Sequence, residues 1–176
     1  MGIRPFYRPM LAVAATLILI IETPAAAAPT QRPHPPTVQQ QIDAQLAKAP
    51  GGKQISPTEV SYGNGTFVIT FVAPANTSVG ADCPSGWFCF YDRTGYGYPR
   101  GKLSSCGWQD LAWWAWNDRT ESVHYNISTG SVAFINHTGA PDHSDDVVLF
   151  SAGANSRYRS DVAPYRNMAD HVYRYC

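Results

Sequence analysis

The sequence predicts a mostly β protein, a sandwich or a barrel, braced by disulfide bonds. Beyond residue 82, short apolar runs alternate with glycine, proline, asparagine and aspartate. Short strands at such close intervals are typical of sandwiches and barrels. An Asn-Gly turn lies between two further apolar runs, and the chain contains four cysteines, all beyond residue 82.

Residues 1–27 are predicted to be a secretory signal peptide. Arg4 and Arg8 precede an apolar run, Leu11 to Ile21, in which Thr16 is the one polar residue and which is too short to span a bilayer comfortably. We place the cut after Ala27, because a later cut would put a proline next to the scissile bond. An uncleaved membrane anchor is the alternative. We therefore expect a secreted, extracellular protein whose mature form is not embedded in a membrane.

The composition narrows the class of partner. Basic and acidic residues are equal in number, 13 each, and charged residues make up only 15% of the chain. A nucleic-acid partner is not expected, because it would require a basic patch. Aromatic residues reach 12%. Few charges with many tyrosines and tryptophans suit a rigid extracellular protein with an aromatic contact surface.

Residues 28–82 are predicted to form an extension of the main domain. It begins with a proline-rich leader, and then Thr37 caps a short helix that ends before Pro50-Gly51-Gly52. A β-hairpin follows, because Gly63-Asn64-Gly65 separates two apolar runs and Asn-Gly favours tight hairpin turns. We place the domain boundary near residue 82. The alternative is that the hairpin docks on the main domain and belongs to it.

The main domain, residues 83–176, is expected to consist of short strands. The one segment with helical character is Gln109 to Trp116, which is long enough for little more than a turn. The strand candidates are 87–91, 123–127, 131–135, 147–150 and 172–175.

The cysteines are expected to form two disulfides, because an even number follows a signal peptide. Three pairings are possible. We favour Cys83–Cys89, which closes a small loop, together with Cys106–Cys176, which ties the last residue into the domain. A zinc site or a catalytic thiol is the less favoured alternative, because the spacings match no CxxC pair.

Two runs of the main domain resemble a known family. They are Cys83-Pro-Ser-Gly-Trp-Phe-Cys-Phe-Tyr-Asp92 and Trp116-Asn-Asp-Arg-Thr-Glu-Ser-Val123. With the residues between them, they resemble the peptidase inhibitor family I36, whose type is a metalloproteinase inhibitor of Streptomyces. The resemblance covers residues 83–176. It implies a two-sheet Greek-key sandwich of βγ-crystallin type, no catalytic residues, and an extracellular peptidase as partner. One departure is Tyr98, which stands where the crystallin signature has glycine.

The crystallin comparison also implies a candidate calcium site. Microbial relatives of that fold bind calcium through paired runs of the form Asn/Asp-Asn/Asp-x-x-Ser/Thr-Ser. The run from Asn117 to Ser122 fits this form except at Glu121, and Arg166 to His171 is the eroded second run. Asn117, Asp118, Glu121 and Ser122 are therefore candidate calcium ligands. The alternative, which we favour, is a loop held together by hydrogen bonds from the same side chains.

Inhibition would require a rigid loop, and two segments are candidates. Thr94 to Lys102 presents Tyr96, Tyr98 and Pro99, and aromatic side chains are frequent anchors of protein contacts. We favour this loop over Asn136 to Asp146, which is longer and polar.

Two other groups of residues carry alternative functions. Trp108, Trp113, Trp114 and Trp116 lie close together, and an exposed indole among them would suit a protein or a cell-wall polysaccharide, although rings that cap the two-sheet core are the favoured interpretation. His137, Asp142, His143, Asp145 and Asp146 could hold a transition metal, although a solvated loop is the favoured interpretation. A calcium-stabilised surface protein is a further alternative. An enzyme is not expected, because no hydrolase, zincin, P-loop or Rossmann motif occurs.

Overall fold

The computed structural model describes residues 2, 34–75, 80–139 and 142–176. The signal peptide predicted over residues 1–27 lies outside these residues, apart from Gly2. In the part of the chain that is described, no helix is long and apolar enough to cross a membrane.

Helix α1 (Val38–Lys48) begins at the predicted cap. The Thr37 hydroxyl accepts a hydrogen bond from the Gln40 amide, and the Gln40 side chain accepts one from the Thr37 amide, so both residues satisfy free donors of the first turn. The helix buries Ile42, and its buried Gln45 donates to the main-chain oxygen of Trp114 at 2.7 Å. Its one buried face therefore attaches it to the β domain.

The strands form two antiparallel sheets, which confirms the mostly β fold. A short 3-10 turn, η1 (Gly63–Gly65), joins the two strands of the predicted hairpin. The seven-stranded sheet has the order β1 (Lys53–Ser56), β2 (Glu59–Tyr62), β3 (Phe67–Thr70), β5 (Gly97–Leu103), β4 (Trp87–Arg93), β7 (Ser122–Asn126), β10 (Tyr158–Arg159). The four-stranded sheet has the order β6 (Gly107–Asp110), β11 (His171–Tyr175), β8 (Ser131–Asn136), β9 (Val147–Gly153).

Beyond residue 86, the two halves of the chain exchange one strand each. Residues 87–126 contribute β4, β5 and β7 to the large sheet, but their third strand, β6, pairs with β11 in the small sheet. Residues 131–175 do the reverse, because β10 leaves β8, β9 and β11 to pair with β7. Matching hydrogen bonds join the halves: the Asp118 amide donates to the Ala169 oxygen, and the Asn167 amide to the Thr120 oxygen.

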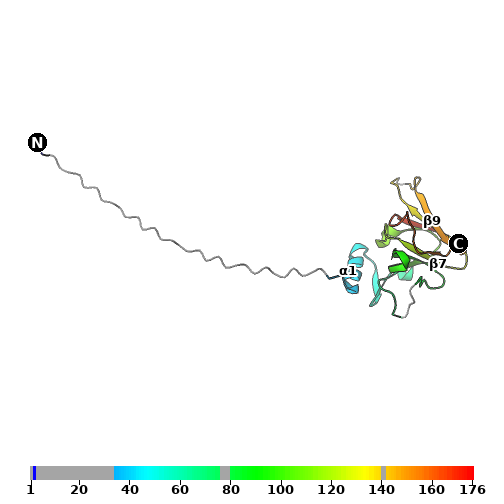
Figure 1. Cartoon of the computed structure of the whole chain (residues 1–176), viewed down its shortest axis with the longest axis horizontal. Coiled ribbons are helices and arrows are strands. Elements are labelled where there is room, and N and C mark those ends of the chain that lie inside the picture. Colours follow the sequence, from blue (N-terminus) through cyan, green and yellow to red (C-terminus); the bar gives the residue numbers. More distant parts are fainter. Residues whose placement is uncertain (1, 3–33, 76–79, 140–141) are drawn as a thin grey trace. The chain divides into compact units, whose positions relative to one another are not determined.

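The boundary expected near residue 82 is not a division of the folded chain. Strand β3 pairs with β5 along its whole length, from Phe67 opposite Leu103 to Thr70 opposite Arg100. Residues 35–176 accordingly form one compact unit, whose described residues are drawn in colour in Figure 1. The alternative, that the hairpin belongs to the main domain, is the correct one. Its strands bury apolar side chains in the common core instead of standing alone.

Aromatic side chains fill the space between the two sheets. Phe90 of β4 packs edge-on against Trp116 at a ring distance of 5.3 Å and against Phe134 of β8 at 6.0 Å. Phe67 of β3 lies 4.4 Å from the ring of Trp114. Since these rings come from both sheets, one core holds the whole β domain together.

Gly101 provides a test of this packing. A Cβ atom there would lie 2.6 Å from the ring of Phe90 and 2.9 Å from that of Phe67. Gly101→Ala is therefore expected to lower the free energy of unfolding by about 1–3 kcal/mol, the usual cost of overpacking a core. Urea denaturation would measure it, with Ser151→Ala on an exposed position of β9 as the control. An unchanged midpoint for Gly101→Ala would contradict this packing.

Candidate protein-contact site

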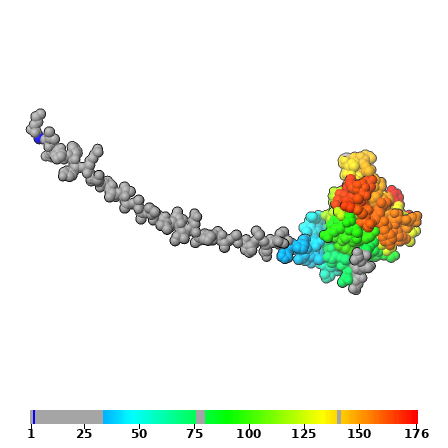
Figure 2. Space-filling model, in the orientation of Figure 1, coloured from blue at the N-terminus to red at the C-terminus, as the bar shows by residue number. Residues whose placement is uncertain are grey.

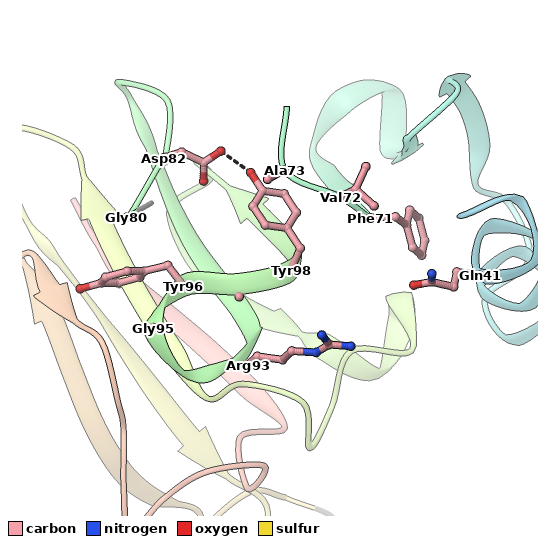
Figure 3. A pocket seen from close by; sticks show the side chains of 11 residues that line it. Gln41, Phe71, Val72, Ala73, Gly80, Asp82, Arg93, Gly95, Tyr96 and Tyr98 are labelled. Carbon is pink, nitrogen blue, oxygen red and sulfur yellow. Dashed lines mark hydrogen bonds between the residues drawn. The ribbon is translucent and has the colours of Figure 1, made fainter. Parts of the chain in front are cut away.

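The predicted binding residues Tyr96 and Tyr98 line a pocket of about 480 Å³ on the large sheet. In Figure 3, Tyr98 points its hydroxyl toward Asp82, while Phe71 and Gln41 border the pocket from the other side. The rings of Tyr96 and Tyr98 both pack edge-on against the buried Tyr91, at 5.5 and 6.1 Å. Both tyrosines are thus half-buried supports of this surface, with only part of each ring exposed.

The favoured loop, residues 94–102, is not a loop. One 3-10 turn, η2 (Thr94–Tyr96), leads directly into β5, and this strand is paired with β3 on one side and β4 on the other. Pro99 is buried in that strand. The glycines and the proline suggested a loop, but Gly101 is required by the close approach of two rings and not by a turn. Only Thr94 and Gly95 remain as an exposed hairpin tip.

A buried ion pair lies at the edge of the pocket. Asp82 accepts from the Arg100 guanidinium at 2.9 Å, and their side chains are 11% and 5% exposed. The hydroxyls of Tyr91 and Tyr98 also donate to the Asp82 carboxylate. Burial first, and then this carboxylate, raise the pKa of both phenols, so that they stay neutral donors at ordinary pH. The network fixes Asp82 and with it the start of the next segment.

That segment is a disulfide-closed turn at the surface. The predicted pairing Cys83–Cys89 is confirmed, and Pro84, Ser85 and Gly86 inside it are exposed. Gly86 has a φ of 84°, in the left-handed region. It is the third residue of a tight turn that requires this conformation, which glycine adopts readily. The disulfide itself packs against the ring of Tyr91.

Asn126 of β7 holds the same turn from a second side. Its main-chain oxygen accepts from the Gly86 amide at 2.8 Å, and its side-chain amide donates to the Cys83 oxygen at 2.8 Å. Arg157 in turn donates to the Asn126 side chain at 3.3 Å. The disulfide and two hydrogen bonds with Asn126 therefore hold this exposed backbone, and Arg157 holds the Asn126 side chain in turn.

The second predicted disulfide, Cys106–Cys176, is also confirmed. Cys106 precedes β6 of the first half of the domain, and Cys176 follows β11 of the second half. In the described part of the chain, no cysteine is free. Two disulfides are typical of proteins that fold in an oxidising compartment.

Two of the four candidate calcium ligands, Glu121 and Ser122, are engaged in hydrogen bonds within the protein. The Glu121 carboxylate accepts from the Thr94 amide at 3.1 Å and from the Asn167 side chain at 2.9 Å. Ser122 is buried, with its hydroxyl bonded to the main chain of Arg93 and to the amide of Tyr96. These bonds match the favoured interpretation of a hydrogen-bonded loop.

Two of the candidate ligands remain available to a cation. Asn117 and Asp118 are exposed, and burial together with the charge of Asp170 raises the pKa of Asp118. Calcium binding therefore stays a prediction, and we expect it to be weak and confined to one site. Calorimetry that found two comparable high-affinity sites would contradict it.

The four tryptophans do not lie on one helix. Trp108 belongs to β6, and only a 3-10 turn, η3 (Leu111–Trp114), follows it. Trp114 and Trp116 are buried in the core, whereas Trp113 is 60% exposed and Trp108 is 37% exposed. The left-handed residue Ala115 ends the turn between Trp113 and Trp116, so these two side chains do not share one helix face.

The polar segment between β8 and β9 has no helix or strand at residues 137–139 and 142–146. Asp142 and Asp145 are exposed. His137 and His143, in contrast, both contact Asp146, and His171 of β11 joins them although it lies far away in the sequence. Sequence reasoning missed His171, because only the pairing of β11 with β8 brings it there.

Comparisons of this chain with models of protein families, with curated proteins and with solved structures found no match.

His124, on the outer face of the large sheet, predicts a dependence of stability on pH. It is 4% exposed, neither ring nitrogen has a hydrogen-bond partner, and the ring stacks on Tyr158. Burial and then Arg157 lower its pKa, while Asp82 opposes them. The unfolded chain binds the proton more readily, so this histidine costs stability as the pH falls below its ordinary pKa of about 6.5.

His124→Phe should therefore lose less unfolding free energy than the wild type between about pH 7 and pH 5. Urea denaturation at the two pH values would measure the difference. His34→Ala, at an exposed position, is the matched control and should keep the wild-type slope. A wild-type slope in His124→Phe would show that His124 is not the group responsible.

Proposed function

We propose that this chain is a secreted protein-binding domain that inhibits an extracellular peptidase through the turn Pro84-Ser85-Gly86. The observation that carries the proposal is the double fixation of this exposed turn, by the disulfide Cys83–Cys89 and by Asn126. A segment already held in its bound shape loses little conformational entropy on binding, so more of the contact energy appears as affinity.

The disulfide gives this turn a second property that suits an inhibitor. A peptidase that cut any bond between Cys83 and Cys89 would leave the two new ends covalently joined. The hydrogen bonds from Asn126 would hold the cut strand in the cleft. Such a segment is a poor substrate, because the products cannot separate.

We propose further that the fold is of the βγ-crystallin type, with two Greek keys. Its support is the exchange of β6 and β10 between the sheets. The large sheet contains β4, β5 and β7 of the first half with β10 of the second, and the small sheet contains β8, β9 and β11 of the second half with β6 of the first. In each half, the fourth strand lies beside the first, as in a Greek key. This topology agrees with the resemblance of residues 83–176 to the inhibitor family I36.

The test is a titration of thermolysin-like, subtilisin-like and trypsin-like peptidases with the purified protein. We expect inhibition of at least one class, with a metallopeptidase first. Ser85→Glu should weaken inhibition by more than tenfold, because a charge at the centre of an interface costs about 2 kcal/mol of binding free energy. Ser128→Glu, at an exposed turn that no disulfide closes, is the control. Equal effects of the two variants would contradict the role of the turn, and no inhibition of any class would contradict the function.

A second candidate function is binding to a cell-wall polysaccharide, which a different surface favours. Trp108 of β6 lies directly opposite Tyr173 of β11, and the ring of Tyr175 lies 4.7 Å from that of Tyr173. All three rings are at least one-third exposed on one face of the small sheet. A row of rings on a flat sheet suits stacking on sugar units. Retention on insoluble peptidoglycan or chitin, lost in Trp108→Ala and kept in Trp113→Ala, would favour this function over inhibition.

A further inference from the structure

Three histidines and an aspartate meet at one end of the small sheet. His137 and Asp146 stand near the two ends of the loop between β8 and β9, and His143 lies within that loop. His171 is the first residue of β11, opposite Ile135 of β8. One ligand atom from each of the four lies within 4.8 Å of the others.

The loop residues converge on one carboxylate. His137 Nδ1 lies 2.8 Å from Asp146 Oδ1, and His143 Nδ1 lies 3.2 Å from Asp146 Oδ2. The Asp146 side chain is only 8% exposed. A carboxylate withdrawn from water is stabilised by cationic or strongly donating neighbours, and here these neighbours are imidazoles.

His171 is not explained by hydrogen bonding. It is 5% exposed, and neither of its ring nitrogens has a hydrogen-bond partner. Its nearest carboxylate oxygen, Asp110 Oδ1, is 3.6 Å from Nδ1, which is too far for a hydrogen bond. The ring instead lies 5.1 Å from that of His143 and 5.6 Å from that of His137. The buried imidazole of His171 therefore has nitrogen atoms without hydrogen-bond partners, next to two further imidazoles, and these nitrogens are available to bind a ligand.

We propose that His137, His143, Asp146 and His171 bind a divalent transition-metal ion, zinc foremost. Imidazole nitrogens with one carboxylate suit zinc and its neighbours, whereas calcium and magnesium require oxygen ligands. In a tetrahedral site with Zn–N bonds of about 2.0–2.1 Å, ligand atoms lie about 3.4 Å apart. The ligand atoms already lie within 4.8 Å of one another, so small side-chain rotations, above all of the exposed His143, would bring them to this spacing.

Residues around the cluster support a metal site. Asp110, whose Oδ1 lies 3.6 Å from His171 Nδ1, would need only a small approach to become the hydrogen-bonded partner of that ring, a role that carboxylates commonly have beside ligating histidines. The bound ion would pin the loop before β9, which projects from the surface in gold in Figure 2, to strand β11. This function is separate from the turn 84–86.

Trp108 supplies a built-in reporter. Its indole lies 4.6 Å from the ring of His171 and 5.1 Å from that of His143. An ion bound by these histidines should change the tryptophan fluorescence, and Co²⁺ in place of Zn²⁺ should give the visible absorption of a tetrahedral nitrogen–oxygen site.

The experiment titrates the chain, carrying no histidine tag, with ZnCl₂ by calorimetry and with CoCl₂ by absorption. We expect one ion per chain and a higher melting temperature with zinc. His143→Ala should weaken zinc binding by more than about tenfold. Removing a residue that only supports a metal ligand already weakens binding by about this factor, and removing the ligand itself should weaken it at least as much. Because His143 is exposed, this variant should melt at the wild-type temperature without metal.

His34→Ala and His124→Phe change the two histidines outside the cluster and should leave the zinc affinity unchanged. Asp146→Asn and His171→Asn test the other ligands, and each should also abolish the cobalt spectrum. Absence of zinc binding by the wild type, or equal affinity of the wild type and His143→Ala, would overturn the proposal. Excess CaCl₂ that displaced the zinc would overturn the assignment to a nitrogen-ligated metal.

Discussion

Asp82→Ala is expected to lower the free energy of unfolding by about 3–5 kcal/mol, the cost of leaving one member of a buried ion pair alone. The Arg100 side chain, 5% exposed, would lose its carboxylate partner. The hydroxyls of Tyr91 and Tyr98 would lose their acceptor at the same time. Since Asp82 leads into the turn at 84–86, the variant should also weaken any inhibition.

Urea denaturation would measure the effect against two further variants. Tyr98→Phe removes only one hydrogen bond to the charged group and should cost about 1.5–3 kcal/mol. Asp161→Asn breaks the pair with Arg166, in which both side chains are more than 40% exposed, and should change stability little. If Asp82→Ala were no worse than Asp161→Asn, the network would not be the buried support described here.

Removing the disulfide Cys106–Cys176 is expected to cost about 4 kcal/mol, and removing Cys83–Cys89 about 2 kcal/mol. The reason is loop length: the first pair is separated by 70 residues and the second by 6. A disulfide that closes a longer loop restricts the unfolded chain more, so removing that disulfide increases the entropy of the unfolded state more.

The double variants Cys106→Ser/Cys176→Ser and Cys83→Ser/Cys89→Ser, each unfolded in urea, would compare the two losses. The second variant should keep most of its stability and yet lose inhibition, since it frees the turn at 84–86. A larger loss of stability in the second variant would contradict the loop-length argument. Full inhibition by it would contradict the need for a closed turn.

Local signals in the sequence were sufficient for several elements. Thr37 and the glycine pair after Pro50 predicted both ends of α1, because caps and terminators act through neighbouring atoms. Asn64 predicted the hairpin turn, where its φ is 54°. The number of disulfides followed from the even number of cysteines in a chain expected to be exported. Each of these predictions depends on residues that are close in the chain or on chemistry alone.

The remaining features depend on partners that the sequence does not reveal. In the sequence, Gly101 looks like a loop residue, but it lies in a strand where the rings of Phe90 and Phe67 leave no space for a Cβ atom. The domain boundary predicted near residue 82 does not divide the folded chain, because β3 pairs with β5. His171 entered the histidine cluster through the pairing of β11 with β8. In each case a long-range contact decided the role, and neither composition nor periodicity reports such contacts.

The exchange of β6 and β10 also determines how firmly the two halves of the domain are joined. Neither half completes its own sheet, so an isolated half would expose strand edges. Each half gives a strand to the sheet of the other, as the two subunits of a domain-swapped dimer do, and the exposed residues Ser128 and Thr129 lie in the connection between them. Cys106–Cys176 adds a covalent bond between the two halves. A chain nicked at Thr129 would remain a single particle, because its two pieces already hold each other as subunits do.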